Sequence, residues 1–175
     1  WNQGFPYNLK CPAIKGLKPP CCCVATAFAQ IFYHYQYPAS GRGAHSYNWN
    51  GTVLTADFDH PYYWDRMLLD YQSTPGTGEQ NEAIAQLMYD LGVAFEMDYA
   101  LAGSGAYASD ALTALPHFFK YSDDIKIIDR SQVSSDNDWF DIAAQQVDMG
   151  LPVAFSIYSE DSGHEVVIDG YRVSQ

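Results

Sequence analysis

The sequence predicts an α+β fold in which helices come first and strands come last. Apolar residues recur at helical spacing in several segments up to residue 149, and short runs rich in Val and Ile follow. This order is typical of folds whose helical and antiparallel β parts are segregated. A chain of 175 residues can bury one core, or two lobes that share a cleft, so we expect residues 1–175 to form a single domain.

The first helix is predicted from Val24 to Gln36. Six apolar side chains repeat there at helical spacing, and Pro38 closes the run because proline cannot continue a helix. Residues 1–22 contain several prolines and are expected to form an irregular arm. Cys23 therefore lies at the N-terminal end of a buried helix.

The segment 39–78 is rich in Gly, Asn, Asp and Tyr and is expected to consist of loops, with one short helix at 64–71. A second long helix is predicted over 79–91, where apolar residues occupy one face. Gly92 should be its C-terminal stop, because glycine readily adopts the left-handed conformation that ends helices.

Two more helices are predicted near 109–119 and 139–149, and Pro116 should kink or shorten the first of them. Strands are predicted at 125–128, 152–157 and 165–171. A short polar turn at 159–163 should join the last two strands.

Composition narrows the possible partners. Acidic residues number 21 against 9 Lys and Arg, and the net charge of −12 argues against nucleic acids and anionic membranes. No stretch approaches the roughly 20 apolar residues of a membrane span. The chain begins at Trp1 without a signal peptide, which leaves room for an export signal or pro-segment that has been removed.

All four cysteines lie between residues 11 and 23. Cys11 could reach Cys21 or Cys22 in a short-loop disulfide, whereas adjacent cysteines cannot easily bridge each other, because disulfides favour Cα atoms about 5.5 Å apart. A zinc site is the competing interpretation, but three consecutive cysteines lack the spacing that points two thiolates at one metal. We therefore expect no metal and no cofactor.

Cys23 is a candidate nucleophile. The positive end of a helix favours thiolate over thiol, and a neighbouring imidazolium would favour it further. The alternative is an inert structural cysteine, which most buried cysteines are.

His164 is the candidate base, because it follows Gly163 at the entrance of a predicted strand, where a side chain can face a cleft. His34 lies eleven residues after Cys23 in the same helix, about 16 Å away, and is too distant to act on its thiol. The other three histidines, expected to be solvated or structural, are His45, His60 and His117.

Several stretches spread over nearly the whole chain resemble the streptopain family of secreted bacterial cysteine peptidases, which have a papain-like fold. The matching stretches, in the family's order, are Trp1-Asn2-Gln3, Pro6-Tyr7-Asn8, Cys23-Val24-Ala25-Thr26-Ala27, Ala29-Gln30, Leu91-Gly92-Val93, Met97-Asp98-Tyr99, Gly103-Ser104-Gly105-Ala106, Gly163-His164 and Val167-Ile168-Asp169-Gly170.

The resemblance implies Cys23 as nucleophile and His164 as general base and then acid. It also implies an oxyanion hole formed by the Gln3 side chain and the backbone N–H of Cys23. A glycine-rich loop lets a peptide backbone approach closely. The residues expected to border the substrate cleft are Gly103, Ser104, Gly105 and Ala106.

The chain departs from the family pattern at three places. It has Cys21-Cys22 where the family has Thr-Gly, and Glu165 where a small residue follows the histidine. The family continues into an Asn-Trp-Gly-Trp-Gly segment that orients the histidine, whereas this chain ends at Gln175. Glu165 and Asp169 lie at odd offsets from His164 in a strand and should face away from its ring. We therefore expect the C-terminal portion to be missing and to be supplied as continuous sequence or as a cleaved but associated chain.

The resemblance implies a secreted endopeptidase that hydrolyses peptide bonds through a thioester, with protein or peptide substrates and an inhibitory pro-segment. Residues 1–175 would then be its catalytic domain. Two alternatives remain open at this point. One is a thiol amidase that acts on cell-wall peptides, and the other is a catalytically silent binding or adhesin module that keeps the fold.

Overall fold

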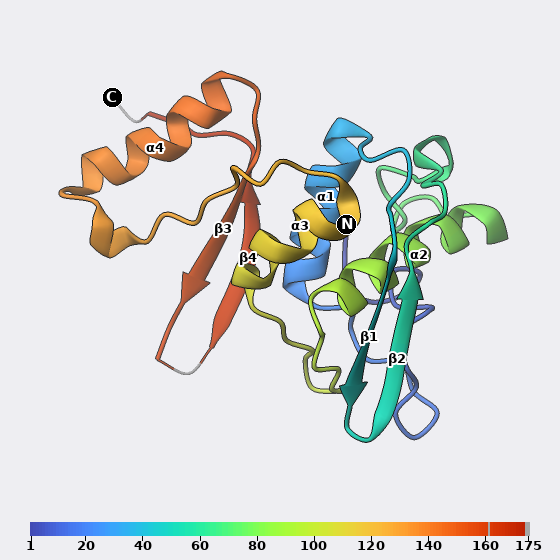
Figure 1. The fold of residues 1–175 in the computed structure, drawn as a ribbon. Coiled ribbons are helices and arrows are strands. Elements are labelled where there is room, and N and C mark those ends of the chain that lie inside the picture. Colours follow the sequence, from blue (N-terminus) through green and yellow to red (C-terminus); the bar gives the residue numbers. More distant parts are fainter. Residues whose placement is uncertain (161, 174–175) are drawn as a thin grey trace.

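Helix α1 (Cys23–Tyr35) lies in the middle of the molecule, between two structurally distinct sides (Figure 1). The structure is a computed structural model and describes residues 1–160 and 162–173. One side holds α2 (Gly78–Ala94) and an antiparallel hairpin of β1 (Ala44–Trp49) and β2 (Thr52–Asp57). The other holds a second antiparallel hairpin, β3 (Val153–Tyr158) and β4 (Gly163–Ile168), against which α1 packs directly.

Two further helices complete the architecture. Helix α3 (Ala111–Phe119) contacts α1 through an edge-to-face pair of Phe32 and Phe119, whose ring centroids are 5.1 Å apart. Helix α4 (Asp136–Asp148) lies against β3. The α+β prediction is confirmed. None of the helices in the described residues is long and apolar enough to cross a membrane.

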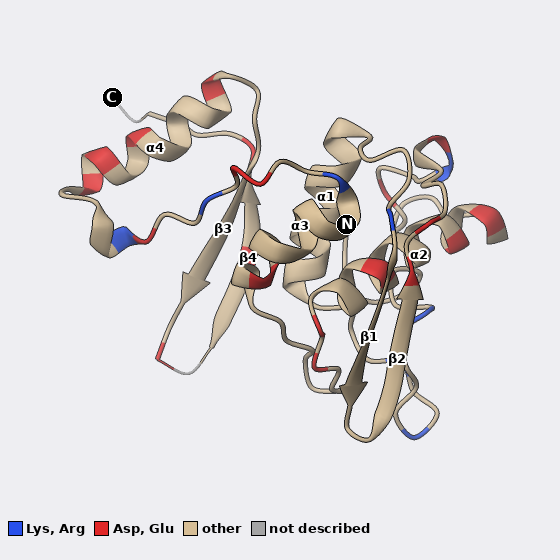
Figure 2. Cartoon of the chain, viewed as in Figure 1, with Lys and Arg blue, Asp and Glu red and all other residues tan. Residues whose placement is uncertain are grey.

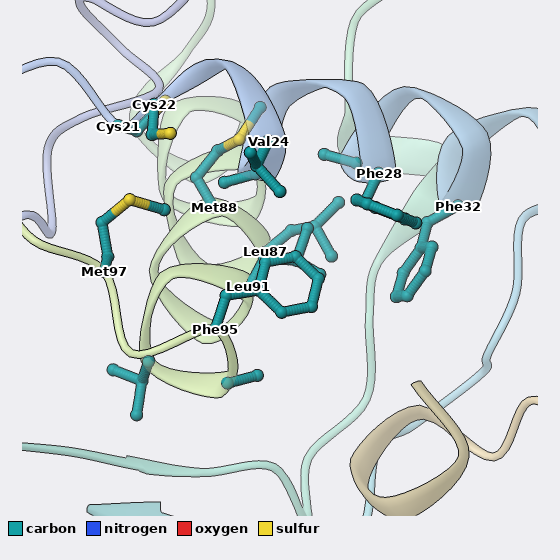
Figure 3. Close-up of a cluster of buried hydrophobic side chains, with 14 of the residues drawn as sticks. Cys21, Cys22, Val24, Phe28, Phe32, Leu87, Met88, Leu91, Phe95 and Met97 are labelled. Carbon is teal, nitrogen blue, oxygen red and sulfur yellow. The ribbon is translucent and has the colours of Figure 1, made fainter. Parts of the chain in front are cut away.

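The main core forms between α1 and α2. Figure 3 shows Val24 and Phe28 of α1 on the side of Leu87 and Leu91 of α2, with Phe32 further along α1. Most of these side chains are almost completely removed from water, and each contributes roughly 1.5–3 kcal/mol through burial. This apolar stripe is the one that predicted the first helix, which begins one residue earlier than expected.

Helix α1 starts and ends with unusual backbone conformations. Its N-cap residue, Cys22, has φ +81° and ψ 147°, a region that glycine adopts and L residues rarely do. The helix ends at Gln36, which has a left-handed backbone conformation. The N–H of Gln36 donates to the carbonyl groups of Phe32 and Tyr33. Pro38 follows two residues later.

Helix α2 begins as a capping box and runs past the predicted stop. The Thr77 hydroxyl accepts from the Gln80 N–H, and the Gln80 side chain accepts from the Thr77 N–H. The prediction that Gly92 ends the helix is wrong, because Gly92 lies inside it. A Cβ there would stand 2.1 Å from the hydroxyl oxygen of Tyr99, so glycine is required by close packing rather than by a turn.

The prediction of loops with one short helix over 39–78 is wrong in one respect, because β1 and β2 form a hairpin there. Asn50 and Gly51 both have positive φ, +48° and +83°, and make the two-residue turn between the strands. The short helix predicted at 64–71 is reduced to a single 3-10 turn, Trp64–Arg66.

The later elements agree with prediction except for one strand. Segment 125–128 belongs to no sheet of the described chain, and the side chains of Ile127 and Ile128 are exposed rather than packed. Helix α3 is preceded by a 3-10 turn, Ala108–Asp110, and contains Pro116 in its interior. Residue 161 of the predicted turn lies outside the described residues.

Candidate active site

Packing of α1 against β4 brings Cys23 and His164 to the same place. Cys23 is the first residue of α1 and is half-buried, while His164 is the second residue of β4 and is exposed. Both residues line two cavities, one of about 220 Å³ and one of about 670 Å³. The two cavities thus share these two residues in their walls.

The surroundings of Cys23 favour its thiolate. The largest contribution is a hydrogen bond from the thiol of Cys22, whose Sγ lies 4.0 Å from that of Cys23. The backbone N–H of Glu165 and the side chain of His164 act in the same direction, while partial burial opposes them. Together they lower the pKa of Cys23 well below its ordinary value and raise that of Cys22.

The N-terminal arm carries Gln3 to the smaller cavity, which also contains Cys23 and His164. Two contacts hold the arm in place. The Cys21 N–H donates to the Gln3 carbonyl oxygen at 2.9 Å, and the Trp1 indole N–H donates to the Leu68 carbonyl oxygen at 2.8 Å. Gln3 is therefore held by Cys21, two residues before Cys23 in the chain.

Three of the four glycine-rich loop residues line the larger cavity, namely Ser104, Gly105 and Ala106. The Ser104 hydroxyl donates to the Pro20 carbonyl oxygen at 2.5 Å, which ties the loop to the segment before α1. Gly103 does not line this cavity in the described part of the chain. Its N–H donates to the Ala100 carbonyl oxygen at 3.1 Å, which keeps it in an exposed turn.

Sequence reasoning missed several residues of the larger cavity. Its walls also carry Phe95, Glu96, Asp98, Tyr107 and Tyr158. Asp98 could have been found from its place in the matched Met97-Asp98-Tyr99 stretch. Tyr158 lines the cavity beside Gly163, with which it pairs in the β3–β4 hairpin. Figure 2 shows acidic residues at several places on α4 and at a few places on α2.

Glu165 does not contact the ring of His164 through a hydrogen bond in the described structure. Its side chain is 6% exposed and accepts a 2.5 Å hydrogen bond from Ser156 on the neighbouring strand. Burial raises the pKa of this carboxyl. Glu165 is buried while the preceding His164 is exposed, but both residues line the same two cavities.

The other histidines lie in separate environments. His60 Nε2 is 2.8 Å from Oδ2 of the fully buried Asp90, which also accepts from the Tyr62 hydroxyl at 2.8 Å. His45 contacts Glu96 at 2.9 Å. His34 is exposed in the last turn of α1. His117 is exposed in α3, and none of these four histidines lines either cavity that Cys23 lines.

The remaining cysteines do not form the disulfides that the sequence left open. All four thiols are free, and Cys11, Cys21 and Cys22 are buried. The Cys21 thiol instead lies 3.7 Å from the Thr26 hydroxyl. Among the residues that the structure describes, no group of three His, Cys, Asp or Glu side chains could hold a metal ion.

Sequence comparisons find named relatives of this chain. The family model of the Peptidase C10 family matches residues 1–175. Streptopain of Streptococcus pyogenes is 31% identical over 191 residues, which cover 97% of this chain and 47% of streptopain. The thiol protease/hemagglutinin PrtT of Porphyromonas gingivalis is 29% identical over 177 residues, covering 98% and 20%.

A solved structure agrees with the sequence comparisons. Active interpain A, a cysteine protease of Prevotella intermedia, superposes with a TM-score of 0.87 at 35% identity, covering 98% of this chain and 74% of its own. The chain spans about half the length of the streptopains that it matches. The match over every residue and the shared papain-like fold show that this chain belongs to the Peptidase C10 family.

Proposed function

We propose that the chain is the catalytic domain of a cysteine endopeptidase. The observation that carries this proposal is that Cys23 and His164 line the same two cavities. An endopeptidase must accommodate substrate residues on both sides of the scissile bond. Two separate cavities that share Cys23 and His164 in their walls support such an arrangement.

The chemistry follows from the residues present. The Cys23 thiolate, paired with protonated His164, attacks the peptide carbonyl carbon and forms a C–S bond. The imidazolium then gives its proton to the leaving amine as the C–N bond breaks, which leaves a thioester. Water, deprotonated by His164, attacks the thioester and releases the acid and the thiolate.

The developing oxyanion needs donors about 3 Å away, and losing one typically costs roughly 3 kcal/mol. We assign this role to the amide of Gln3 and the backbone N–H of Cys23. The first N–H groups of a helix have no partner within it, so the position of Cys23 in α1 supports the assignment. The placement of Gln3 in the same cavity as the thiol supports its part.

We also propose that the protein acts outside the cell and is made with an inhibitory pro-segment. The streptopain resemblance supports export, and the solved fragment of prointerpain A, a similar protein from Prevotella intermedia, supports a pro-segment. Substrates would be proteins or peptides.

Two assays test the proposal. One is labelling by an irreversible thiol-directed peptide inhibitor, and the other is hydrolysis of an unfolded protein. The wild-type protein should react stoichiometrically and cleave the protein, and Cys23→Ser should do neither. Cys11→Ser removes a buried thiol outside the site and should keep both properties. Labelling without protein cleavage would indicate the amidase, and no labelling of the wild type would indicate a silent module.

A further inference from the structure

The thiol that precedes Cys23 is itself unusual. Cys22 is completely buried, and its Sγ is 4.0 Å from the Sγ of Cys23. Cys22 also has a positive φ of +81°, which is unusual for a residue other than glycine. Figure 3 shows Cys22 at the edge of the core, beside the start of α1.

Such a pair matches the arrangement of a peroxide-sensitive thiol. Cysteines that form sulfenic acids have thiolate character and access to solvent, and a second cysteine is often poised beside them. Cys23 meets these conditions, since it is half-buried, lines two cavities and is held as a thiolate by its neighbours. Cys22 lies close enough to react with the sulfenic acid of Cys23.

We infer that Cys22 is a resolving cysteine that captures peroxide-oxidised Cys23 in a reversible Cys22–Cys23 disulfide. In the first step the Cys23 thiolate attacks hydrogen peroxide, an S–O bond forms, the O–O bond breaks and hydroxide leaves. In the second step the Cys22 sulfur attacks the sulfenic sulfur, the S–S bond forms and the S–O bond breaks. The hydroxide that leaves takes up the Cys22 thiol proton and becomes water. In total the thiolate and the thiol lose two electrons, and peroxide becomes one hydroxide ion and one water.

The first step prepares the second. The contact with the Cys23 thiolate is the largest reason why the pKa of Cys22 is raised, with burial next. Sulfenic acid formation removes that neighbouring negative charge and makes the Cys22 thiol easier to deprotonate. The same oxidation makes the Cys23 sulfur electrophilic. The Cys22 sulfur can then attack it, and hydroxide can leave.

The resulting bond should be easily reduced. Consecutive Cα atoms are about 3.8 Å apart, below the usual range of about 4.4–6.8 Å for disulfides. Strained disulfides have higher reduction potentials and are the labile ones. The pair would therefore protect Cys23 from irreversible oxidation and return the thiolate when small thiols are supplied. As a regulation of the peptidase, this inference rests on the proposed function.

Mass spectrometry of the peroxide-treated protein tests it independently of peptidase activity. We expect the peptide that contains Cys21, Cys22 and Cys23 to lose the mass of two hydrogen atoms, with backbone fragmentation blocked between Cys22 and Cys23. Dithiothreitol should restore thiol labelling at Cys23. In Cys22→Ser, which keeps a hydroxyl donor, the same dose should give sulfinic and sulfonic acid at Cys23 and at least about tenfold less recovery of labelling.

Cys21→Ser removes the neighbouring buried thiol and should behave as the wild type. Cys22→Gly provides a second variant without the resolving thiol, in case serine at this position prevents folding. Equal recovery in the wild type and the Cys22 variants, a link that involves Cys21, or unlinked oxidation of Cys23 in the wild type would each overturn the inference. Because these readouts are masses and labels, a protein without peptidase turnover would refute the proposed function and leave this result interpretable.

Discussion

Replacing Cys22 by glycine should raise the pKa of Cys23 without unfolding the protein. The thiol of Cys22 is the largest contributor to the lowered pKa of Cys23. Hydrogen bonds to charged groups contribute about 1.5–3 kcal/mol, and the 4.0 Å separation and partial exposure place this one at or below the lower end. Since one pKa unit corresponds to about 1.4 kcal/mol, we expect an increase of about one unit.

The folding free energy should change little, because two effects oppose each other. Glycine relieves the conformation of Cys22 at φ +81°, which costs a non-glycine residue about 1–3 kcal/mol. It also removes a buried side chain worth about 1 kcal/mol and adds about 0.5–1 kcal/mol of unfolded-state entropy. The net change should lie within about 1 kcal/mol of zero, as urea denaturation can establish.

The assay is the rate of iodoacetamide alkylation of Cys23 as a function of pH. Its midpoint should move to higher pH in Cys22→Gly, because a higher pKa leaves less thiolate at a given pH. Cys22→Ser retains a hydrogen-bond donor and serves as the matched control, with a midpoint close to that of the wild type. An unchanged midpoint in a folded Cys22→Gly protein would refute the view that Cys22 stabilises the thiolate.

Three further predictions concern other parts of the molecule. Gln3→Ala should lower kcat by about 10²–10³ with little change in inhibitor labelling, and an unchanged kcat in steady-state assays would remove Gln3 from the oxyanion hole. Gly92→Ala should destabilise the protein by about 1–3 kcal/mol in thermal denaturation because its Cβ would meet a buried tyrosine hydroxyl, whereas Gly78→Ala, with nothing within 4 Å, should be nearly neutral. The hydrogen bond to Asp90 raises the pKa of His60, so its contribution to stability should be complete below the unfolded pKa of about 6.5 and be lost as pH rises through the folded value. Urea midpoints across this range should show a pH dependence that His60→Gln reduces, and equal slopes in both proteins would contradict the assignment.

Local sequence patterns predict many of the helices and strands. The apolar stripe from Val24 to Tyr35 and the following Pro38 were enough to define α1, because a helix that buries one face repeats its apolar residues every three or four positions. The β3–β4 hairpin was predicted within a few residues from short Val- and Ile-rich runs. The β1–β2 hairpin was missed although Asn50-Gly51 is a strong turn signal, since its strands are largely exposed and carry few apolar residues.

The sequence by itself determined a helix with a cysteine at its start, a late hairpin with a histidine at its entrance, and the family to which this order belongs. Only the tertiary structure decided that Cys23 and His164 face common cavities, that Gly92 accommodates Tyr99, and that Cys22 adopts a glycine-like conformation beside the thiol. Periodicity records which face of an element is buried, because burial is a property of each segment. It does not record which other segment covers that face, because a contact across some 140 residues depends on the packing of the whole chain.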